Sequence, residues 1–419
     1  FIMLYADNKN KENVFLVLLF LGLWVSFLVL IRFFTGVDIE EQSAFLNINI
    51  VSGFLLLVYP LALGFVEKNK YPAFFLFAAL VIVFSIMITQ SRAAIVLSYA
   101  VTAFYFMRLG KNKNFRIFFI IVSTAAAVGI VYAFYMKTGW NSFSERFVWW
   151  KTAWLMFKDN PVFGAGFGNY GALFLYYRPE YVLNTLFAHN IFLQILAETG
   201  IVGIISFAAA FYFMAKNALQ SFKNKSADSI YMKSAAVGII IFLIFNITEY
   251  SFYIPVCLTT FFVLCGFLCR IEIEKRKSRF TFWIIIIAVL VSVYTAVLPV
   301  IAEQYYKIGK KSAAAKNYEN AKEQYLKAVK YDAKNPEYLH QAADCSFKLY
   351  VLSFQTEKSY LEETIDLELH SEKFYVHSAQ IKSGIANLYS LKGDLQNAEK
   401  YTEAARKFDK FNPNYGNMQ

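Results

Sequence analysis

Three pieces of one polar loop decide how this chain folds: Ser142-Phe-Ser-Glu-Arg-Phe-Val-Trp-Trp150, Asn160-Pro-Val-Phe-Gly-Ala-Gly-Phe-Gly-Asn-Tyr-Gly171 and Ala188-His-Asn-Ile-Phe-Leu-Gln-Ile-Leu-Ala-Glu-Thr-Gly200. Membrane-length apolar runs lie on both sides of this loop, which is the longest polar interruption in the hydrophobic part of the chain. It holds His189, the only histidine before residue 340. Because imidazole is the side chain that most readily exchanges a proton near neutral pH, we expect the chemistry of the protein here.

The composition is that of a membrane protein with a polar C-terminal part. The chain is 58% hydrophobic and 19% aromatic, and both fractions are higher than in an ordinary soluble globular protein. Residues 1–299 are mostly apolar runs and residues 300–419 are polar and charged, so we place a domain boundary near Pro299. The net charge of +11 calls for no nucleic-acid partner, because much of the Lys and Arg lies in short loops between apolar runs. The four cysteines have neither disulfide nor zinc spacing.

Apolar runs long enough to cross a bilayer predict about nine membrane-spanning helices. They lie at residues 14–34, 48–66, 71–89, 93–107, 115–136, 190–215, 234–248, 252–269 and 280–299. The expected fold is therefore all-α, with a polytopic helical bundle over residues 1–299 followed by a soluble helical repeat domain. The chain begins with Phe1 and opens with no signal-peptide pattern, so we expect further N-terminal spans to precede it.

Loop charges predict which way the spans run. Lys and Arg cluster in alternate loops, at residues 9–11, 67–70, 108–116, 216–233 and 270–279, and the loops between them are acidic or nearly neutral. Positive loops stay in the cytoplasm. We therefore expect the loop at residues 137–190 and everything after residue 300 to lie outside it.

The polar loop contains a helix signal of its own. Ser142 to Glu145 form a capping-box pattern, which predicts a helix to about Lys158, ended by Asn160-Pro161 and lying along the membrane interface. Asn190 begins or caps the sixth span. Asn190, Gln194 and Glu198 recur every four residues, so one face of that span carries a polar stripe.

From residue 301 the sequence resembles a tetratricopeptide array. Asn317 to Pro336 match the second helix of such a unit, and the pattern recurs from Gly393 to Pro413. The offset is about 77 residues, against about 68 for two standard units, so a middle repeat with an insertion fits between them. Stacks of this kind offer a concave surface for a protein or peptide partner.

Three side chains are the main candidates for chemistry: His189, Arg92 in Gln90-Ser-Arg-Ala-Ala94, and Arg146 at the start of the aromatic helix. The plain alternatives are a polar interfacial histidine, a snorkelling Arg92, and an Arg146 paired with Glu145 or a lipid headgroup. Two guanidinium groups can hold a pyrophosphate with paired hydrogen bonds, which lysine does poorly. Arg32, Arg178 and Glu249 are weaker candidates for the same pocket.

The segment Gly166-Phe-Gly-Asn-Tyr-Gly171 matches the dinucleotide pattern G-x-G-x-x-G. We reject that interpretation, because no strand precedes the segment and no parallel sheet can be built here. Two interpretations remain: a turn at Gly166 that brings the backbone close to a ligand, or a plain loop. The sequence has no Asp-x-Asp pair, metal-ligand cluster or Walker motif. These features favour a reaction without metal, nucleotide or other cofactor.

The order of these motifs resembles the O-antigen ligase and polymerase superfamily of membrane glycosyltransferases. The resemblance rests on Ser-Arg-Ala at residues 91–93, an arginine opening an aromatic helix at residue 146, Asn-Pro-x-x-Gly-x-Gly-x-Gly at residues 160–168, and His-Asn-x-x-Leu-Gln-x-x-x-Glu-x-Gly at residues 189–200. It covers roughly residues 45–270. It implies metal-independent transfer of a glycan from undecaprenyl pyrophosphate to a hydroxyl acceptor.

By the same resemblance, His189 would deprotonate the acceptor, and Arg92 and Arg146 would hold the pyrophosphate. The protein would lie in the bacterial inner membrane, with the loop at residues 137–190 and the repeats in the periplasm. Members usually have about a dozen spans with both ends cytoplasmic, so about four would be missing from this chain and the span at residues 280–299 would be the one that exports the repeats.

Three acceptors are compatible with the resemblance. The main expectation is a ligase acting on lipid A–core, and the alternatives are a polymerase of O-antigen or capsule repeat units and a protein O-oligosaccharyltransferase. The exported repeats suit a protein partner or a protein acceptor. A different class is a transporter or flippase with an external scaffold. That class predicts internal repeats and mid-membrane charges, and the sequence has no repeat within the spans and few charges away from span ends.

Overall fold

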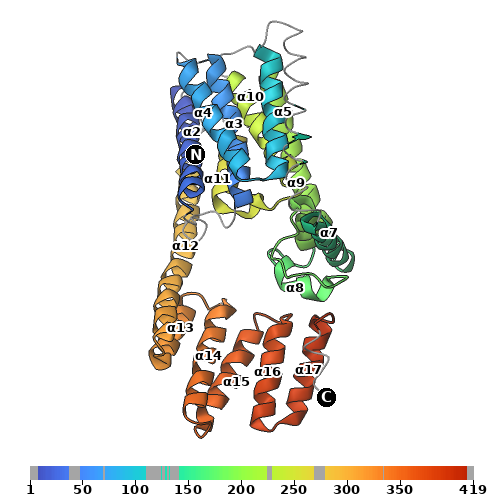
Figure 1. Cartoon of the computed structure of the whole chain (residues 1–419), viewed down its shortest axis with the longest axis vertical. Coiled ribbons are helices and arrows are strands. Elements are labelled where there is room, and N and C mark those ends of the chain that lie inside the picture. The colour runs from blue at the N-terminus through green and yellow to red at the C-terminus, as the bar shows by residue number, and fades with distance from the viewer. Residues whose placement is uncertain are drawn as a thin grey trace. The chain divides into compact units, whose positions relative to one another are not determined.

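The structure is a computed structural model that describes residues 8–36, 48–68, 71–109, 141–223, 229–268, 279–333 and 335–412, with the single positions 124, 128, 129 and 132. These residues form helices and turns and contain no strand, which confirms the all-α expectation for this part of the chain. Internal contacts divide the chain into two units (Figure 1). The first comprises Phe1–Tyr170 and Thr185–Ile273, and the second comprises Gly171–Asn184 and Glu274–Gln419.

The apolar runs of the first unit become helices close to their expected bounds. These are α2 (Asn8–Thr35), α3 (Ile48–Lys68), α4 (Pro72–Ile88), α5 (Arg92–Leu109), α9 (Ile191–Lys223), α10 (Ser229–Phe245) and α11 (Pro255–Leu268). Among the described residues, 3 helices, α2, α3 and α9, are long and apolar enough to cross a membrane, and α4, α5, α10 and α11 are shorter apolar helices. The run expected at residues 115–136 lies outside the described residues apart from four positions. The total of nine spans stays a prediction.

Helix α3 is the centre of the first unit. It packs against α2, α4, α5, α10 and α11, which surround it in Figure 1. Its side chains Ile50, Leu55 and Leu57 are completely buried. Helix α10 approaches α3 closely at Gly238, where a Cβ atom would lie 2.6 Å from the carbonyl oxygen of Leu57. Small residues allow such close packing, which favours association between apolar helices.

The helix expected in the polar loop is present. Helix α7 (Asn141–Asp159) ends just before Pro161, as the capping and proline signals indicate. It packs against α9 and buries Val148, Ala153 and Met156. Phe147 and Trp154 on its other side are exposed, which suits a helix lying at a membrane interface.

The second unit is a series of helices that pack against their neighbours in chain order. They are α12 (Arg279–Ala314), α13 (Tyr318–Tyr331), α14 (Pro336–Leu352), α15 (Lys358–Glu372), α16 (Ala379–Lys392) and α17 (Leu395–Phe408). Gly393 ends α16 with a φ of 86°, and the Asp394 side chain then caps α17 by accepting from the backbone N–H of Asn397. Helices α13 and α17 occupy the two stretches expected to be second helices, with α14, α15 and α16 between them. The tetratricopeptide assignment stays a prediction.

The boundary between the units differs from the expected one. Pro299 lies inside α12, which continues to Ala314, because a proline removes one helix hydrogen bond without having to end a helix. The second unit begins at Glu274 and also takes in residues 171–184. The change in composition at residue 299 therefore marks a change along one helix and not a break in the chain.

A histidine ion pair in the second unit predicts a pH dependence. Nδ1 of His340 on α14 lies 2.7 Å from Oε1 of Glu368 on α15, and this hydrogen bond raises the pKa of His340. Because the folded state favours the protonated imidazole, protonation of His340 stabilises the fold. This contribution to stability is complete below the ordinary imidazole pKa of about 6.5, and it is lost as pH rises through the pKa of the folded state. In hydrogen exchange of the whole chain, α14 and α15 should be better protected in the wild type than in His340→Gln at pH 6. The difference should shrink by pH 8, and a difference independent of pH would contradict this.

Candidate active site

His189 lies two residues before α9 in a strained backbone conformation. Its φ is 51°, in the left-handed region that few residues other than glycine adopt. The turn is fixed on both sides. The Asn190 side chain accepts hydrogen bonds from the N–H groups of Phe192 and Leu193, each at 3.0 Å, and Gln194 Oε1 accepts from the N–H of Ala188 at 2.9 Å. Strain held in place in this way is typical of functional positions.

Two aromatic rings and one carboxylate lie close to the imidazole. The ring of Trp149 lies 4.4 Å from it, centroid to centroid, and the ring of Tyr250 lies 4.6 Å away, edge on. Nδ1 of His189 is 3.7 Å from Oε2 of Glu249. The His189 side chain is 16% exposed, so the imidazole is sheltered and still reachable.

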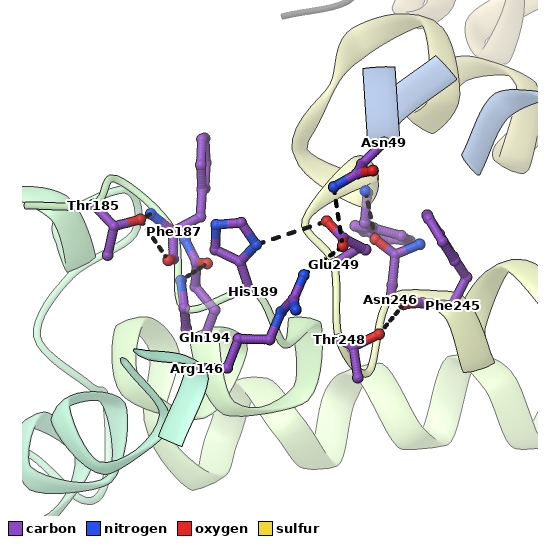
Figure 2. Close-up of polar contacts among 12 residues, drawn as sticks. Asn49, Arg146, Thr185, Phe187, His189, Gln194, Phe245, Asn246, Thr248 and Glu249 are labelled. Carbon is purple, nitrogen blue, oxygen red and sulfur yellow. Dashed lines mark hydrogen bonds and ion pairs between the residues drawn. The ribbon is translucent and has the colours of Figure 1, made fainter. Parts of the chain in front are cut away.

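Glu249 connects His189 to Arg146. Its Oε1 accepts a hydrogen bond from Arg146 Nη2 at 2.7 Å, and Asn49 Nδ2 on α3 lies 3.5 Å from the same oxygen (Figure 2). The Glu249 side chain is only 4% exposed. The ion pair weighed for Arg146 in the sequence is thus made, with Glu249 in place of Glu145, and the arrangement brings together a base, a cation and an anion.

The turn that carries Glu249 is bonded directly to the start of α9. The N–H of Ile191 donates to the carbonyl of Asn246 at 2.9 Å, and the Asn246 side chain accepts from the N–H of Phe252 at 2.8 Å. The turn lies between α10 and a short 3-10 helix, Ser251–Tyr253. Two segments that lie 55 positions apart in the sequence are therefore held side by side. The hydrogen bonds that hold them do not involve the side chains of His189, Arg146 or Glu249.

Arg92 lies at the same end of the first unit. It is the first residue of α5, after a tight turn in which Gln90 has a φ of 58°. Ser52 on α3 donates to Thr89 of this turn at 2.7 Å. Ser52 is one helical turn from Asn49, which faces Glu249. The structure thus places Arg92 near the end of the bundle that holds His189 and Arg146, with its side chain half-buried.

The glycine-rich loop and α9 form an interlocking joint. Helix α9 has a kink at Gly200, where φ is 65°, and the kink takes the carbonyls of residues 197 and 198 out of the helical hydrogen-bond pattern. The N–H groups of Ala165 and Gly166 bind these two carbonyls at 2.8 and 2.9 Å. In return, the N–H groups of Ile201 and Val202 donate to the carbonyls of Pro161 and Val162.

Glycine is required at this joint because the two backbones nearly touch. A Cβ atom on Gly164 would lie 2.3 Å from the backbone of Glu198, and one on Gly200 would lie 2.3 Å from the Val162 oxygen. The glycine-rich loop thus packs closely against the backbone of α9. Gly166, expected either to approach a ligand or to lie in a plain loop, binds Glu198 in this joint.

Glu198 belongs to the support beneath the site. It is 1% exposed, and its Oε1 accepts from Gln194 Nε2 at 3.1 Å and from the N–H of Tyr170 at 3.3 Å. Tyr170 in turn donates its hydroxyl to the Trp149 carbonyl at 2.8 Å, and burial raises the pKa of Tyr170 well above its usual range. The polar stripe on α9 is therefore connected by hydrogen bonds, through Tyr170, to Trp149, whose ring packs against His189.

Arg178 is engaged elsewhere. It lies in the second unit, where Nη2 pairs with Asp409 and Nη1 donates to the Val182 carbonyl at 2.6 Å. Both side chains of the ion pair are almost completely buried, and the Tyr181 ring lies 5.0 Å from the guanidinium carbon. The charge of Arg178 is therefore balanced by Asp409 within the second unit. Arg32 lies in the last turn of α2.

Sequence reasoning missed the ring partners of the histidine. Trp149 and Tyr250 gave no signal beyond being aromatic, and Glu249 was only a weak candidate, because nothing in a single sequence says which loops meet. An acidic residue in a short turn between two apolar runs is the sequence signal that could have singled out Glu249. Within the described residues, no group of three or more His, Cys, Asp or Glu side chains is close enough to share a metal ion.

Comparison with known proteins agrees with the motifs. Residues 77–208 match the model of a family described as O-antigen ligase. No curated protein matches the chain. The matched residues include Arg92, Arg146 and His189, and do not include Glu249. The match supports the O-antigen ligase superfamily and an enzyme of the membrane glycosyltransferase type, and with the apolar helices it indicates a membrane protein.

Proposed function

We propose that the protein transfers a glycan from undecaprenyl pyrophosphate to a hydroxyl acceptor, as an O-antigen ligase does with lipid A–core. The observation that carries the proposal is the meeting of His189, Arg146 and Glu249 in a sheltered site within or beside the family match. A base beside a cation suits a reaction in which a hydroxyl loses a proton while a phosphate leaves. We infer that the reaction needs neither metal nor cofactor.

In this reaction His189 acts as the general base. The acceptor O–H proton passes to Nε2, the nitrogen that does not face Glu249, and the oxygen bonds to the anomeric carbon of the donor sugar. The bond from that carbon to the phosphate oxygen breaks, and its electron pair leaves with the pyrophosphate. A sugar hydroxyl is far too weak an acid to ionise alone at neutral pH, so a positioned base contributes typically about 10²–10⁴-fold.

The arginines stabilise the leaving group. Pyrophosphate is already a stable anion, so it needs paired positive charge more than it needs a proton. Arg146 faces the site directly, and Arg92 lies at the same end of the first unit. We propose that both hold the pyrophosphate, through the paired donors that a guanidinium offers and an ammonium does not.

The orientation of the site is part of the proposal. We propose that the end of the first unit that holds His189, and the helices from α13 onward, face the periplasmic side of the bacterial inner membrane, and the loop charges support this. An alkaline phosphatase reporter fused after Pro336 should therefore be active, and one fused at Lys113 inactive. The reverse pattern would place the site in the cytoplasm and contradict the proposed donor geometry.

The acceptor distinguishes the ligase from its alternatives. A lipid-linked polymerase lengthens the glycan on the donor, and a protein oligosaccharyltransferase modifies a hydroxyl of a polypeptide, for which the helices of the second unit would be the docking surface. Purified protein supplied with labelled donor and lipid A–core should place the label on lipid A–core, in the presence of EDTA. Label found only on longer lipid-linked chains, or only on protein, would replace the ligase assignment by one of these two.

A further inference from the structure

The carboxylate of Glu249 has one oxygen that is bonded and one that is not. Oε1 is held by Arg146, whereas Oε2 is buried and has no hydrogen-bond partner among the described residues. Nδ1 of His189 is likewise buried without such a partner, and it lies 3.7 Å from Oε2. Buried polar atoms without partners are rare and costly. Here two complementary ones face each other, slightly beyond hydrogen-bond distance (Figure 2).

The surroundings restrict what Glu249 can respond to. Among the described residues, the imidazole has Glu249 as a charged neighbour, with Arg146 on α7 behind it, and it also contacts the rings of Trp149 and Tyr250. Asn49 contributes an uncharged amide from α3. The turn around Glu249 is already held by Asn246 through its bonds to Ile191 and Phe252. These bonds hold the turn without the Glu249 side chain.

One negative charge is shared unequally between two partners. The guanidinium of Arg146 attracts the carboxylate at 2.7 Å and keeps Oε2 from closing on the imidazole. An anion that binds Arg146 competes for the same guanidinium and weakens that attraction. The carboxylate then gains by accepting a hydrogen bond from Nδ1–H of His189. That bond holds the proton on Nδ1, leaves the lone pair on Nε2 for the acceptor hydroxyl, and stabilises the imidazolium that forms, as the carboxylate does in a Ser-His-Asp triad.

We propose that Glu249 is a positioning residue that couples binding of the pyrophosphate at Arg146 to the activation of His189. This inference rests on the proposed function and adds to it an order of events. The base becomes effective only when a donor occupies the site, so an acceptor hydroxyl or water is not activated without a sugar to attack. The transfer step itself is unchanged: the acceptor proton moves to His189, and the sugar–phosphate electron pair leaves with the pyrophosphate.

The first test is spectroscopic and needs no turnover. The whole chain, labelled with ¹⁵N-histidine, is titrated with undecaprenyl pyrophosphate, and the His189 resonances are identified by their absence in His189→Gln. In the wild type the anion should shift His189 toward the Nδ1–H tautomer, with a stronger hydrogen bond at Nδ1. The shift should be absent in Glu249→Gln. A wild-type His189 spectrum that is the same with and without bound anion would overturn the coupling.

The second test is kinetic. Glu249→Gln keeps the shape of the side chain and should lower kcat about 10- to 100-fold, less than loss of the base itself, with the donor KM changed little. The acid limb of its pH–rate profile should move to lower pH, because the imidazolium has lost its carboxylate, and Glu249→Asp should recover part of kcat. Glu145→Gln on the same helix α7 is the matched control and should behave as wild type.

The outcomes separate this inference from the function beneath it. Normal kcat and an unshifted profile in Glu249→Gln, in a preparation whose wild type transfers glycan, would refute the coupling and leave the transferase intact. A wild type that transfers no glycan yet shows the tautomer shift would keep the coupling of anion and imidazole and refute the transferase. If Glu249→Gln fails to insert, the wild-type titration and Glu249→Asp decide.

Discussion

Replacing His189 by alanine is expected to lower kcat for glycan transfer about 10²–10⁴-fold. The imidazole is the group positioned to take the acceptor proton, since Asn190 and Gln194 fix the backbone on both sides of it and Trp149 and Tyr250 flank its ring. The donor should still bind, because its pyrophosphate is held by guanidinium groups and not by His189. The measurement is kcat by product formation alongside direct binding of undecaprenyl pyrophosphate.

A control variant and the arginine variants should behave differently from His189→Ala. His370→Ala removes an exposed histidine of the second unit and should leave kcat unchanged. Arg146→Ala and Arg92→Ala should weaken donor binding as well as turnover, and lysine at either position should restore only part of it. Near-normal turnover in a correctly inserted His189→Ala protein would remove the general base from the account.

Replacing Gly200 by alanine should disrupt the joint between the glycine-rich loop and α9. The new Cβ would lie 2.3 Å from the Val162 oxygen, and φ is 65°. With a ψ of −161° this conformation is essentially restricted to glycine, and it costs another residue about 1–3 kcal/mol. The clash adds about 1–3 kcal/mol, as overpacking commonly does. The backbone hydrogen bonds at the kink would then be lost, so we expect a lower thermal midpoint and impaired transfer, because α9 positions His189.

Gly168→Ala is the matched control for this change. Gly168 has a φ of 79° in the same loop, but nothing lies within 4 Å of a Cβ built there. It therefore carries the cost of a positive φ without the clash. Gly164→Ala, with a clash against Glu198, should resemble Gly200→Ala. Equal thermal midpoints for Gly168→Ala and Gly200→Ala would mean that the close approach of the two backbones does not matter.

The helices were within reach of the sequence because their signals are local. Apolar length predicted the spans at residues 48–66 and 190–215, which the structure gives as Ile48–Lys68 and Ile191–Lys223. The capping pattern at Ser142 and the proline at residue 161 predicted α7. At Pro299 the composition changes while the helix continues. A shift in composition reports the surroundings of a helix and not where it ends.

The site was only half within reach, because its partners are distant in sequence. His189 and Arg146 were singled out by residue type and by the order of motifs, but their meeting through Glu249 depends on how α3, α7, α9 and α10 pack. The glycines were noticed as a pattern, whereas their role requires knowing that α9 is kinked at Gly200. Gln194 and Glu198 were expected to form a polar stripe, and only the structure gives them Ala188 and Tyr170 as partners.

The fate of the sugar–phosphate bond is the most direct measure of the central claim that this site transfers glycans. The purified protein is reconstituted in liposomes with a donor labelled in both the glycan and the undecaprenyl chain, together with a hydroxyl acceptor and EDTA. The account predicts that glycosylated acceptor and free undecaprenyl pyrophosphate appear in equal amounts, and that neither appears with His189→Ala. Donor that crosses the bilayer with its sugar–phosphate bond intact, and no glycosylated acceptor, would contradict it and indicate a flippase.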